Sequence, residues 1–276
     1  MDKLILINIL IMGGVAATAA LVLYFVSRRF RVEPDEIAEK IAAVLPQANC
    51  GGCGCAGCAD FASTCSKADE ESFAKLYCPV GGAKVMSKVA AIKGYAAADK
   101  KPSVAVLRCQ GTCTNAPAKI VYDAVSSCRI ANQISVGSSG CPNGCLHLGD
   151  CVKVCRFGAL SFDEKTQMPV IDISKCTSCG ACVKACPRGL FEIRELSAKG
   201  SLLYVACRNT QKGALARKNC SKACIGCQKC AKLNPEITVE NNLSVIPQTI
   251  DAKEWGAQLS ENCPTGAIIY REKINA

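Results

Sequence analysis

"KCTSCGACVKACPRGL", residues 175–190, places four cysteines in the order C-x2-C-x2-C-x3-C-P. In this pattern a tight loop wraps three thiolates around one cubane, and the fourth thiolate reaches a second cluster. Structural zinc is the main alternative, but it takes two separated C-x2-C knuckles or histidines, which this spacing does not match. The stretch therefore predicts a pair of 4Fe–4S clusters bound by Cys176, Cys179, Cys182 and Cys186 together with cysteines from elsewhere.

A second motif lies upstream, at residues 141–155, and has Leu148 where a cysteine is expected. Such motifs exchange their last cysteines between two clusters. The first predicted ligand set is Cys155, Cys176, Cys179 and Cys182. The second predicted set is Cys186, Cys151, Cys145 and, in place of the missing ligand, Cys141.

An internal repeat organises the C-terminal part of the chain. "SVAVLRC" (103–109) matches "SLLYVAC" (201–207), and Cys141-x3-Cys145-x5-Cys151 matches Cys220-x3-Cys224-x5-Cys230. Short strands and tight turns around cysteines are typical of small α+β ferredoxin folds. The repeat predicts two tandem ferredoxin-like modules, at 103–200 and 201–276.

The second module has lost part of its motif. Asn234-Pro235 stands where Cys-Pro is expected, and no cysteine lies just upstream of Cys263. All four ligands of one cluster are thus absent together, which argues against random decay. The module is predicted to hold one 4Fe–4S cluster, on Cys224, Cys227, Cys230 and Cys263.

The N-terminal region contains a four-cysteine constellation among expected helices at 33–45, 57–66 and 81–93. Its spacing is Cys50-x2-Cys53-x4-Cys58 followed by Cys78-Pro79, and this spacing alone leaves zinc open. Two further cysteines of this region, Cys55 and Cys65, are interpreted as small hydrophobic residues.

Five cysteines remain: Cys109, Cys113, Cys128, Cys207 and Cys220. Cys109, Cys113 and Cys128 could bind a further cluster with Cys141, but Cys141 cannot serve two clusters. The sequence therefore predicts four clusters and leaves a fifth open. The single histidine, His147, is interpreted as a surface loop residue.

Residues 4–26 form an uncharged run long enough to cross a hydrocarbon core of about 30 Å. Arg28, Arg29 and Arg31 follow it, which places the C-terminal side in the cytoplasm. A cleaved signal peptide is the alternative, but the apolar run continues past the small residues and the preceding segment has no excess positive charge. The predicted organisation is an anchor (1–27), a four-cysteine domain (28–94), a linker (95–102) and the two modules. In a reducing cytoplasm the cysteines are expected to be thiols or metal ligands.

The composition limits the function further. The chain has 276 residues, 23 cysteines and a formal net charge of +10, but each cluster with four thiolates brings about −2, so no nucleic-acid partner is expected. No G-x-G-x-x-G or P-loop motif is present, and no substrate chemistry is expected in this chain. The basic stretch 196–235 fits either the docking of an acidic ferredoxin or simple solvation of the surface.

The order of these motifs, from "LPQANCGGCGCAGC" (45–58) to "CLHLGDCVKVCRFGAL" (145–160), resembles the B subunits of Rnf complexes, bacterial ion-translocating ferredoxin:NAD oxidoreductases. The resemblance implies a multisubunit complex of the bacterial cytoplasmic membrane with flavin-bearing partners. It implies electron flow between soluble ferredoxin and the membrane subunits, coupled to Na⁺ or H⁺ transport. It also implies a 4Fe–4S cluster on Cys50, Cys53, Cys58 and Cys78.

Three features depart from that family. Cys55 replaces a tyrosine, Arg156 follows Cys155 where proline is usual, and the second module lacks a cluster. The alternative interpretations are an iron–sulfur subunit of a hydrogenase or formate dehydrogenase, and a zinc protein or redox-sensing regulator. Copurifying subunits and iron analysis would discriminate among them.

Overall fold

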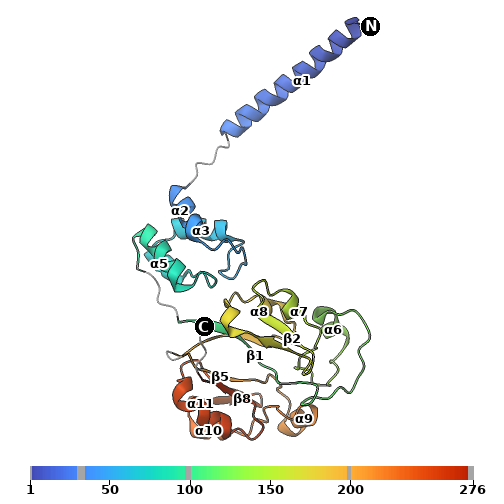
Figure 1. Cartoon of the computed structure of the whole chain (residues 1–276), viewed down its shortest axis with the longest axis vertical. Coiled ribbons are helices and arrows are strands. Elements are labelled where there is room, and N and C mark those ends of the chain that lie inside the picture. Colours follow the sequence, from blue (N-terminus) through green and yellow to red (C-terminus); the bar gives the residue numbers. More distant parts are fainter. Residues whose placement is uncertain (1, 30–34, 97–100, 198–199, 273–276) are drawn as a thin grey trace.

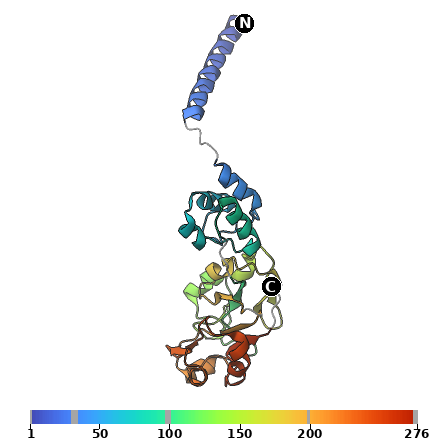
Figure 2. The same cartoon turned by 90° about the vertical axis from the view of Figure 1, so that its left-hand side faces the viewer.

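The computed structural model describes residues 2–29, 35–96, 101–197 and 200–272. The chain consists of a long N-terminal helix, a small helical domain and two modules that contain all the strands (Figure 1). Figure 2 shows these parts one after another along the long axis of the molecule. In this serial arrangement the helical domain lies next to the first module, and the first module lies next to the second (Figure 2).

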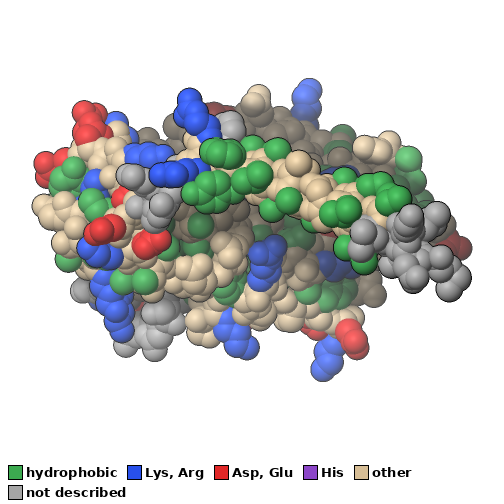
Figure 3. Space-filling view, turned by 90° about the horizontal axis from the view of Figure 1, so that it is seen from above, with side chains coloured by type: hydrophobic (Ala, Val, Ile, Leu, Met, Phe, Trp, Pro, Cys, Tyr) green, Lys and Arg blue, Asp and Glu red, His purple; other side chains and the backbone are tan. Residues whose placement is uncertain are grey.

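Helix α1, Asp2–Arg29, stands apart from the rest of the chain. Its segment Ile7–Arg29 has a mean hydropathy of 2.3, and it is the one helix among the described residues that is long and apolar enough to cross a membrane. Figure 3, which looks down on this end, shows hydrophobic side chains along the helix. Arg28 and Arg29 lie in its last turn.

The helical domain confirms the three helices expected after the anchor. Asp35 accepts hydrogen bonds from the N–H groups of Ile37 and Ala38 and so begins the first helix, while Gly94, with φ of 72°, ends the last. The predicted linker, 95–102, includes residues 97–100, which lie outside the described residues. The helices of the domain are α2 (Glu36–Val44), α3 (Cys58–Lys67), α4 (Glu70–Lys75) and α5 (Gly82–Lys93). Their shared core contains Ile41, Phe61, Phe73, Met86 and Val89.

The first module, residues 103–197, has two strand pairs. Its elements are β1 (Ser103–Leu107), α6 (Cys128–Ile134), α7 (Asp150–Lys153), β2 (Leu160–Asp163), β3 (Met168–Ile171), a 3₁₀ turn (Ile173–Lys175), α8 (Ala181–Ala185) and β4 (Phe191–Glu195). The outer strands β1 and β4 pair antiparallel, and β2 and β3 form a hairpin between them.

The second module, residues 200–272, repeats this strand order. Its elements are β5 (Leu202–Val205), α9 (Gly213–Asn219), α10 (Lys229–Leu233), β6 (Thr238–Glu240), β7 (Leu243–Val245), α11 (Ala252–Glu261) and β8 (Ile268–Arg271). The outer strands β5 and β8 pair antiparallel, as do the inner strands β6 and β7. The matched sequences at 103–109 and 201–207 thus form equivalent first strands.

The modules pack together through these outer strands. A shared apolar cluster contains Val104, Val106, Leu196, Leu202, Tyr204 and Ala206. Beside it, Glu192 accepts from Arg108 at 3.1 Å and from Arg194 at 2.6 Å. Arg194 also donates to the carbonyls of Leu203 (3.3 Å) and Ile246 (2.8 Å) in the second module. One carboxylate therefore holds two arginines that join the modules.

Glu192→Gln should destabilise the paired modules by about 3 kcal/mol. The arginine side chains are only 17% and 11% exposed, and removing the charged partner of a buried ion pair leaves uncompensated charge. Anaerobic urea unfolding of the iron-loaded chain would measure the change. Glu240→Gln, at an exposed position in β6, is the matched control and should change stability little. Equal stability of the two variants would contradict this account of the interface.

Candidate iron–sulfur sites

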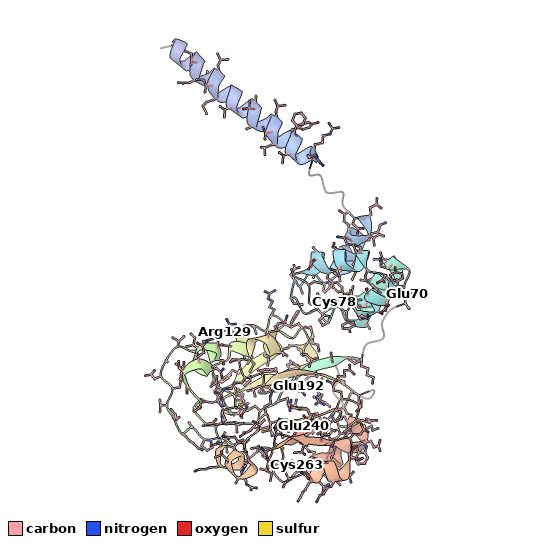
Figure 4. All side chains as sticks on the ribbon, turned by 180° about the vertical axis from the view of Figure 1, so that it is seen from behind. Glu70, Cys78, Arg129, Glu192, Glu240 and Cys263 are labelled. Carbon is pink, nitrogen blue, oxygen red and sulfur yellow. The ribbon has the colours of Figure 1, made fainter. Side chains whose placement is uncertain are left out.

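All 23 cysteines are unpaired thiols. Most of them lie in loops beside the short helices of the modules, where they surround small cavities. Figure 4 labels one cysteine from the first group along the molecule, Cys78, and one from the last, Cys263. Most of the other thiols lie in loops, or line cavities, between these two cysteines.

The Cys176 site lies in the first module, between the hairpin β2–β3 and helix α8. Ser178 and Gly180 have φ of 57° and 74°, which curls the loop around the cavity. The N–H of Ala105 in β1 donates to the Cys176 sulfur at 3.4 Å. Burial raises the pKa of Cys182 to about 12, so the protein alone does not stabilise a thiolate there. The thiols that line this cavity are Cys155, Cys176, Cys179 and Cys182, the set that the spacing groups together.

The Cys186 site lies beside α6 and α7 in the same module. Asp150 accepts from the Ser127 hydroxyl at 3.1 Å and from the N–H of Arg129 at 3.3 Å, which holds the start of α6 against α7. The N–H groups of His147 and Leu190 donate to the sulfurs of Cys145 and Cys186, both at 3.4 Å. The thiols that line this cavity are Cys128, Cys145, Cys151 and Cys186.

Cys141 does not line the Cys186 cavity, contrary to the grouping expected from spacing. Residues 141–144 form a turn in which the N–H of Gly144 donates to the Cys141 carbonyl at 3.1 Å. The guanidinium of Arg188 donates to the carbonyls of Cys141 (3.0 Å) and Gly144 (2.7 Å) and fixes this turn. Cys128, at the first position of α6, occupies the expected place. Proximity in sequence favoured Cys141, whereas the fold brings in a cysteine from a more distant helix.

The Cys263 site lies in the second module, between the loop 224–230 and the end of α11. Gly226 and Gln228 have φ of 62° and 61° and bend this loop around the cavity. The Ser244 hydroxyl lies 3.2 Å from the Cys230 sulfur. The thiols that line the cavity are Cys224, Cys227, Cys230 and Cys263. These are the four that the sequence assigns to one cluster.

The N-terminal site is formed by the loop 47–57, the start of α3 and the segment before α5. Asn49 accepts from the N–H of Cys58 at 2.8 Å, and the N–H of Gly81 donates to the Cys78 sulfur at 3.3 Å. Burial raises the pKa of Cys78, and the neighbouring Cys53 and Cys50 raise it further. The candidate ligands here remain Cys50, Cys53, Cys58 and Cys78.

The N-terminal site touches the Cys176 site. A β-carbon added at Gly52 would lie 2.9 Å from the carbonyl oxygen of Cys179, so only glycine allows this approach. The Arg156 guanidinium donates to the Asn49 carbonyl at 3.3 Å. The arginine that replaces the usual proline thus contacts the loop that carries Cys50 and Cys53.

A fourth cavity lies between the modules and gathers Cys109, Cys141, Cys207 and Cys220, with Cys145 of the Cys186 site also in its wall. The sequence interpretation did not group these four, although the repeat matches Cys109 with Cys207 and Cys141 with Cys220. Cys113, which was considered with Cys109, is exposed and its thiol lies 3.2 Å from the Lys165 carbonyl. His147 is a loop residue whose Nδ1 lies 2.6 Å from the Gln167 carbonyl.

Two cysteines of the helical domain lie outside the candidate ligand set. Cys65 is fully buried in the core, and burial raises its pKa to about 12. The Cys55 sulfur lies 3.9 Å from the Thr64 hydroxyl. Both fit the expectation of small packing residues.

The donor sets fit 4Fe–4S clusters better than single metal ions. Zinc requires its ligands at about 2.0–2.3 Å from one point, and no group of three or more His, Cys, Asp or Glu side chains in the described part of the chain is placed to hold one ion. The thiols instead stand around cavities in groups of four or five, with backbone N–H groups aimed at sulfur. Thiolates in this setting are the usual ligands of cubanes.

Comparison with known proteins agrees with this chemistry. A family model described as a 4Fe-4S dicluster domain matches residues 139–190, a span that contains most of the Cys176 and Cys186 sites. The match identifies the type of cofactor for this part of the chain.

Curated relatives extend the similarity to nearly the whole chain. The chain is 40% identical over 270 residues to the B subunit of the Na(+)-translocating ferredoxin:NAD(+) oxidoreductase complex of Acetobacterium woodii, covering 96% of this chain and 79% of that protein. It is 39% identical over 270 residues to the B subunit of the proton-translocating ferredoxin:NAD(+) oxidoreductase complex of Clostridium ljungdahlii, covering 97% and 93%. It is 36% identical over 274 residues to the B subunit of the ion-translocating oxidoreductase complex of Methanosarcina acetivorans, covering 98% and 100%.

Proposed function

Because the chain belongs to the family of B subunits of ion-translocating ferredoxin:NAD oxidoreductase complexes, we propose that it relays single electrons between soluble ferredoxin and the membrane subunits of such a complex. The chain is thus a subunit of a translocating oxidoreductase and carries no substrate chemistry of its own. Its two modules act as tandem ferredoxin-like units, the second reduced to one cluster of its own.

The observation that carries the proposal is the succession of four-thiol sites along the molecule. The N-terminal site abuts the Cys176 site through Gly52. The Cys176 and Cys186 sites share α7 and α8. Cys151 lies in α7 and Cys155 follows that helix, while Cys182 lies in α8 and Cys186 directly follows it. A serial arrangement of this kind suits electron transfer and has no evident use in a zinc scaffold.

Each site has a defined role for the residues of the chain. When bound, a 4Fe–4S cluster supplies reversible one-electron chemistry. The cysteines ligate iron, the N–H groups of Ala105, His147, Leu190 and Gly81 donate to ligand sulfurs, and such donors tune the reduction potential. The proposed ligand sets are Cys50, Cys53, Cys58 and Cys78; Cys155, Cys176, Cys179 and Cys182; Cys128, Cys145, Cys151 and Cys186; and Cys224, Cys227, Cys230 and Cys263.

Helix α1 is proposed to anchor the relay in the bacterial cytoplasmic membrane, with the soluble part in the cytoplasm. The apolar length and the arginines in the last turn support this orientation. The sites then lie on the side where soluble ferredoxin is found.

Anaerobic purification of the full chain tests the proposed function. We expect iron and acid-labile sulfide in equal amounts, EPR signals of reduced 4Fe–4S clusters, and reduction of those clusters by reduced ferredoxin in stopped flow. A colourless protein that contains zinc, or clusters that ferredoxin cannot reduce, would contradict it.

A further inference from the structure

The cavity between the modules forms a site that the four sets above do not use. Five thiols line it, those of Cys109, Cys141 and Cys145 from the first module and of Cys207 and Cys220 from the second. Cys145 belongs to the Cys186 site, which leaves two thiols from each module. Cys141 and Cys207 are only 6% and 8% exposed. We propose that Cys109, Cys141, Cys207 and Cys220 bind a fifth 4Fe–4S cluster at the module interface. Its role in the relay rests on the function proposed above.

The internal repeat makes the four thiols two equivalent pairs. Cys109 and Cys207 follow the first strands of their modules, and each sulfur accepts from the N–H two residues later, of Gly111 and of Asn209, both at 3.4 Å. Cys141 and Cys220 are also equivalent in the repeat, and the backbone N–H two residues later, of Asn143 and of Lys222, lies beside each sulfur. The two halves of the repeat therefore present the same cysteine geometry to one shared cavity.

Contacts beside the cavity fix the two halves relative to each other. Gln110 donates to the Gly266 carbonyl at 2.8 Å, and Lys119 donates to the Asn219 side chain at 2.7 Å. The N–H of Ser221 donates to the Asn115 carbonyl at 2.8 Å. Each contact joins residues close to a proposed ligand in one module to the other module. A rigid, preformed frame of this kind is what a cluster with ligands from two modules requires.

The charges around the cavity match an anionic occupant. Arg108, Arg208 and Lys222 line it, and no Asp or Glu is found among the described residues of its wall. Four thiolates and an oxidised 4Fe–4S core together carry about −2. Buried negative charge needs compensation of this kind, and the arginines and lysine supply it.

The site also bridges two of the proposed neighbours. The backbone N–H of Cys145, a ligand of the Cys186 site, lies beside the Cys109 sulfur. The backbone N–H of Cys224, a ligand of the Cys263 site, lies beside the Cys207 sulfur. One electron can enter from either side and leave by the other, with no bond made or broken and no proton transferred. Without a cluster in this cavity, no cluster site among the described residues would connect the Cys263 site to the first module.

The five sets together use 20 of the 23 cysteines and leave Cys55, Cys65 and Cys113. Cys113 offers the matched control, because it lies in the same loop as Cys109 but is exposed and outside the cavity. A ligand and a nonligand can thus be compared within one short segment.

The test uses the full chain, reconstituted anaerobically, with Cys109→Ala, Cys207→Ala, the double variant and Cys113→Ala. Iron, sulfide and native mass spectrometry are the readouts. The intact chain should hold about 20 iron atoms, and each single ligand variant about 16. The double variant should also hold about 16, because both changes remove the same cluster, and Cys113→Ala should keep about 20.

Several outcomes would overturn the inference. If native mass spectra of the unsubstituted chain show only four clusters, the inference is wrong. This result does not depend on whether the variants fold. A double variant that loses twice the iron of each single variant would place the cysteines in separate sites. Equal iron loss in Cys113→Ala would assign the ligand to Cys113. An intact chain without iron would instead refute the proposed function as a whole.

Discussion

Removing iron from the anaerobic protein with a strong chelator will abolish the cooperative thermal unfolding of the two modules. Their strands have only three to five residues and most of their helices fewer than eight, lengths that are not stable alone. Cys207 and Cys224 belong to the core of the second module and Cys151 and Cys182 to that of the first. Metal binding at such sites is folding free energy, commonly about 10 kcal/mol or more per site, which equals the whole net stability of many domains.

Far-UV circular dichroism melts before and after chelation would measure this loss. Reductant without chelator is the control, and it should leave the transition unchanged because the chain has no disulfides. The helical domain should keep more of its signal, since its core combines buried cysteines with large apolar side chains, among them Phe61, Phe73 and Met86. An unchanged transition after complete iron removal would show that side-chain packing, and not the clusters, stabilises the modules.

Gly52→Ala should slow turnover of the assembled complex severalfold while its cluster content stays intact. The added β-carbon would lie 2.9 Å from both the Cys179 carbonyl and the Pro79 side chain, so the N-terminal site must move away from the Cys176 site. Electron transfer between clusters falls steeply with the distance between them, so this displacement lowers the rate. NAD reduction driven by reduced ferredoxin, normalised to iron per chain, would measure it.

Arg156→Gln is the companion variant, because it removes the hydrogen bond to Asn49 that joins the same two parts. Arg129→Gln is the matched control: the Arg129 side chain has no hydrogen bond or ion pair to another described residue, and Figure 4 places it at the surface of α6. Full turnover in Gly52→Ala with intact clusters would exclude this contact as the route of electrons.

The sequence predicted the parts of the sites that depend on local spacing. The structure gathers the thiols of the Cys176 and Cys263 sites as the motifs group them. Three thiols of each site come from one short loop, 176–182 or 224–230, and glycine at the turn leaves few other arrangements. It also confirms equivalent strands in the two repeats, since "SVAVL" and "LLYV" are continuous apolar runs that strands bury.

The tertiary structure determines which cysteines share a site where the spacing in the sequence leaves more than one choice. Cys128 and Cys141 are both available to the Cys186 site, and only the turn held by Arg188 directs Cys141 towards the other module. The interface cavity joins cysteines that are far apart in sequence, so no spacing rule describes it. The repeat did contain the signal, because two matched pairs of otherwise unassigned cysteines suggest one shared environment.

The equivalence of the two modules across their contact has an evolutionary consequence. An ancestor with a single module would expose an apolar strand face and two thiols on one flank, and two copies placed back to back would bury both. Duplication and fusion would then turn a symmetric homodimer into one polypeptide. Once joined, the second copy was free to lose a cluster of its own, but not the half-site that its partner still needed.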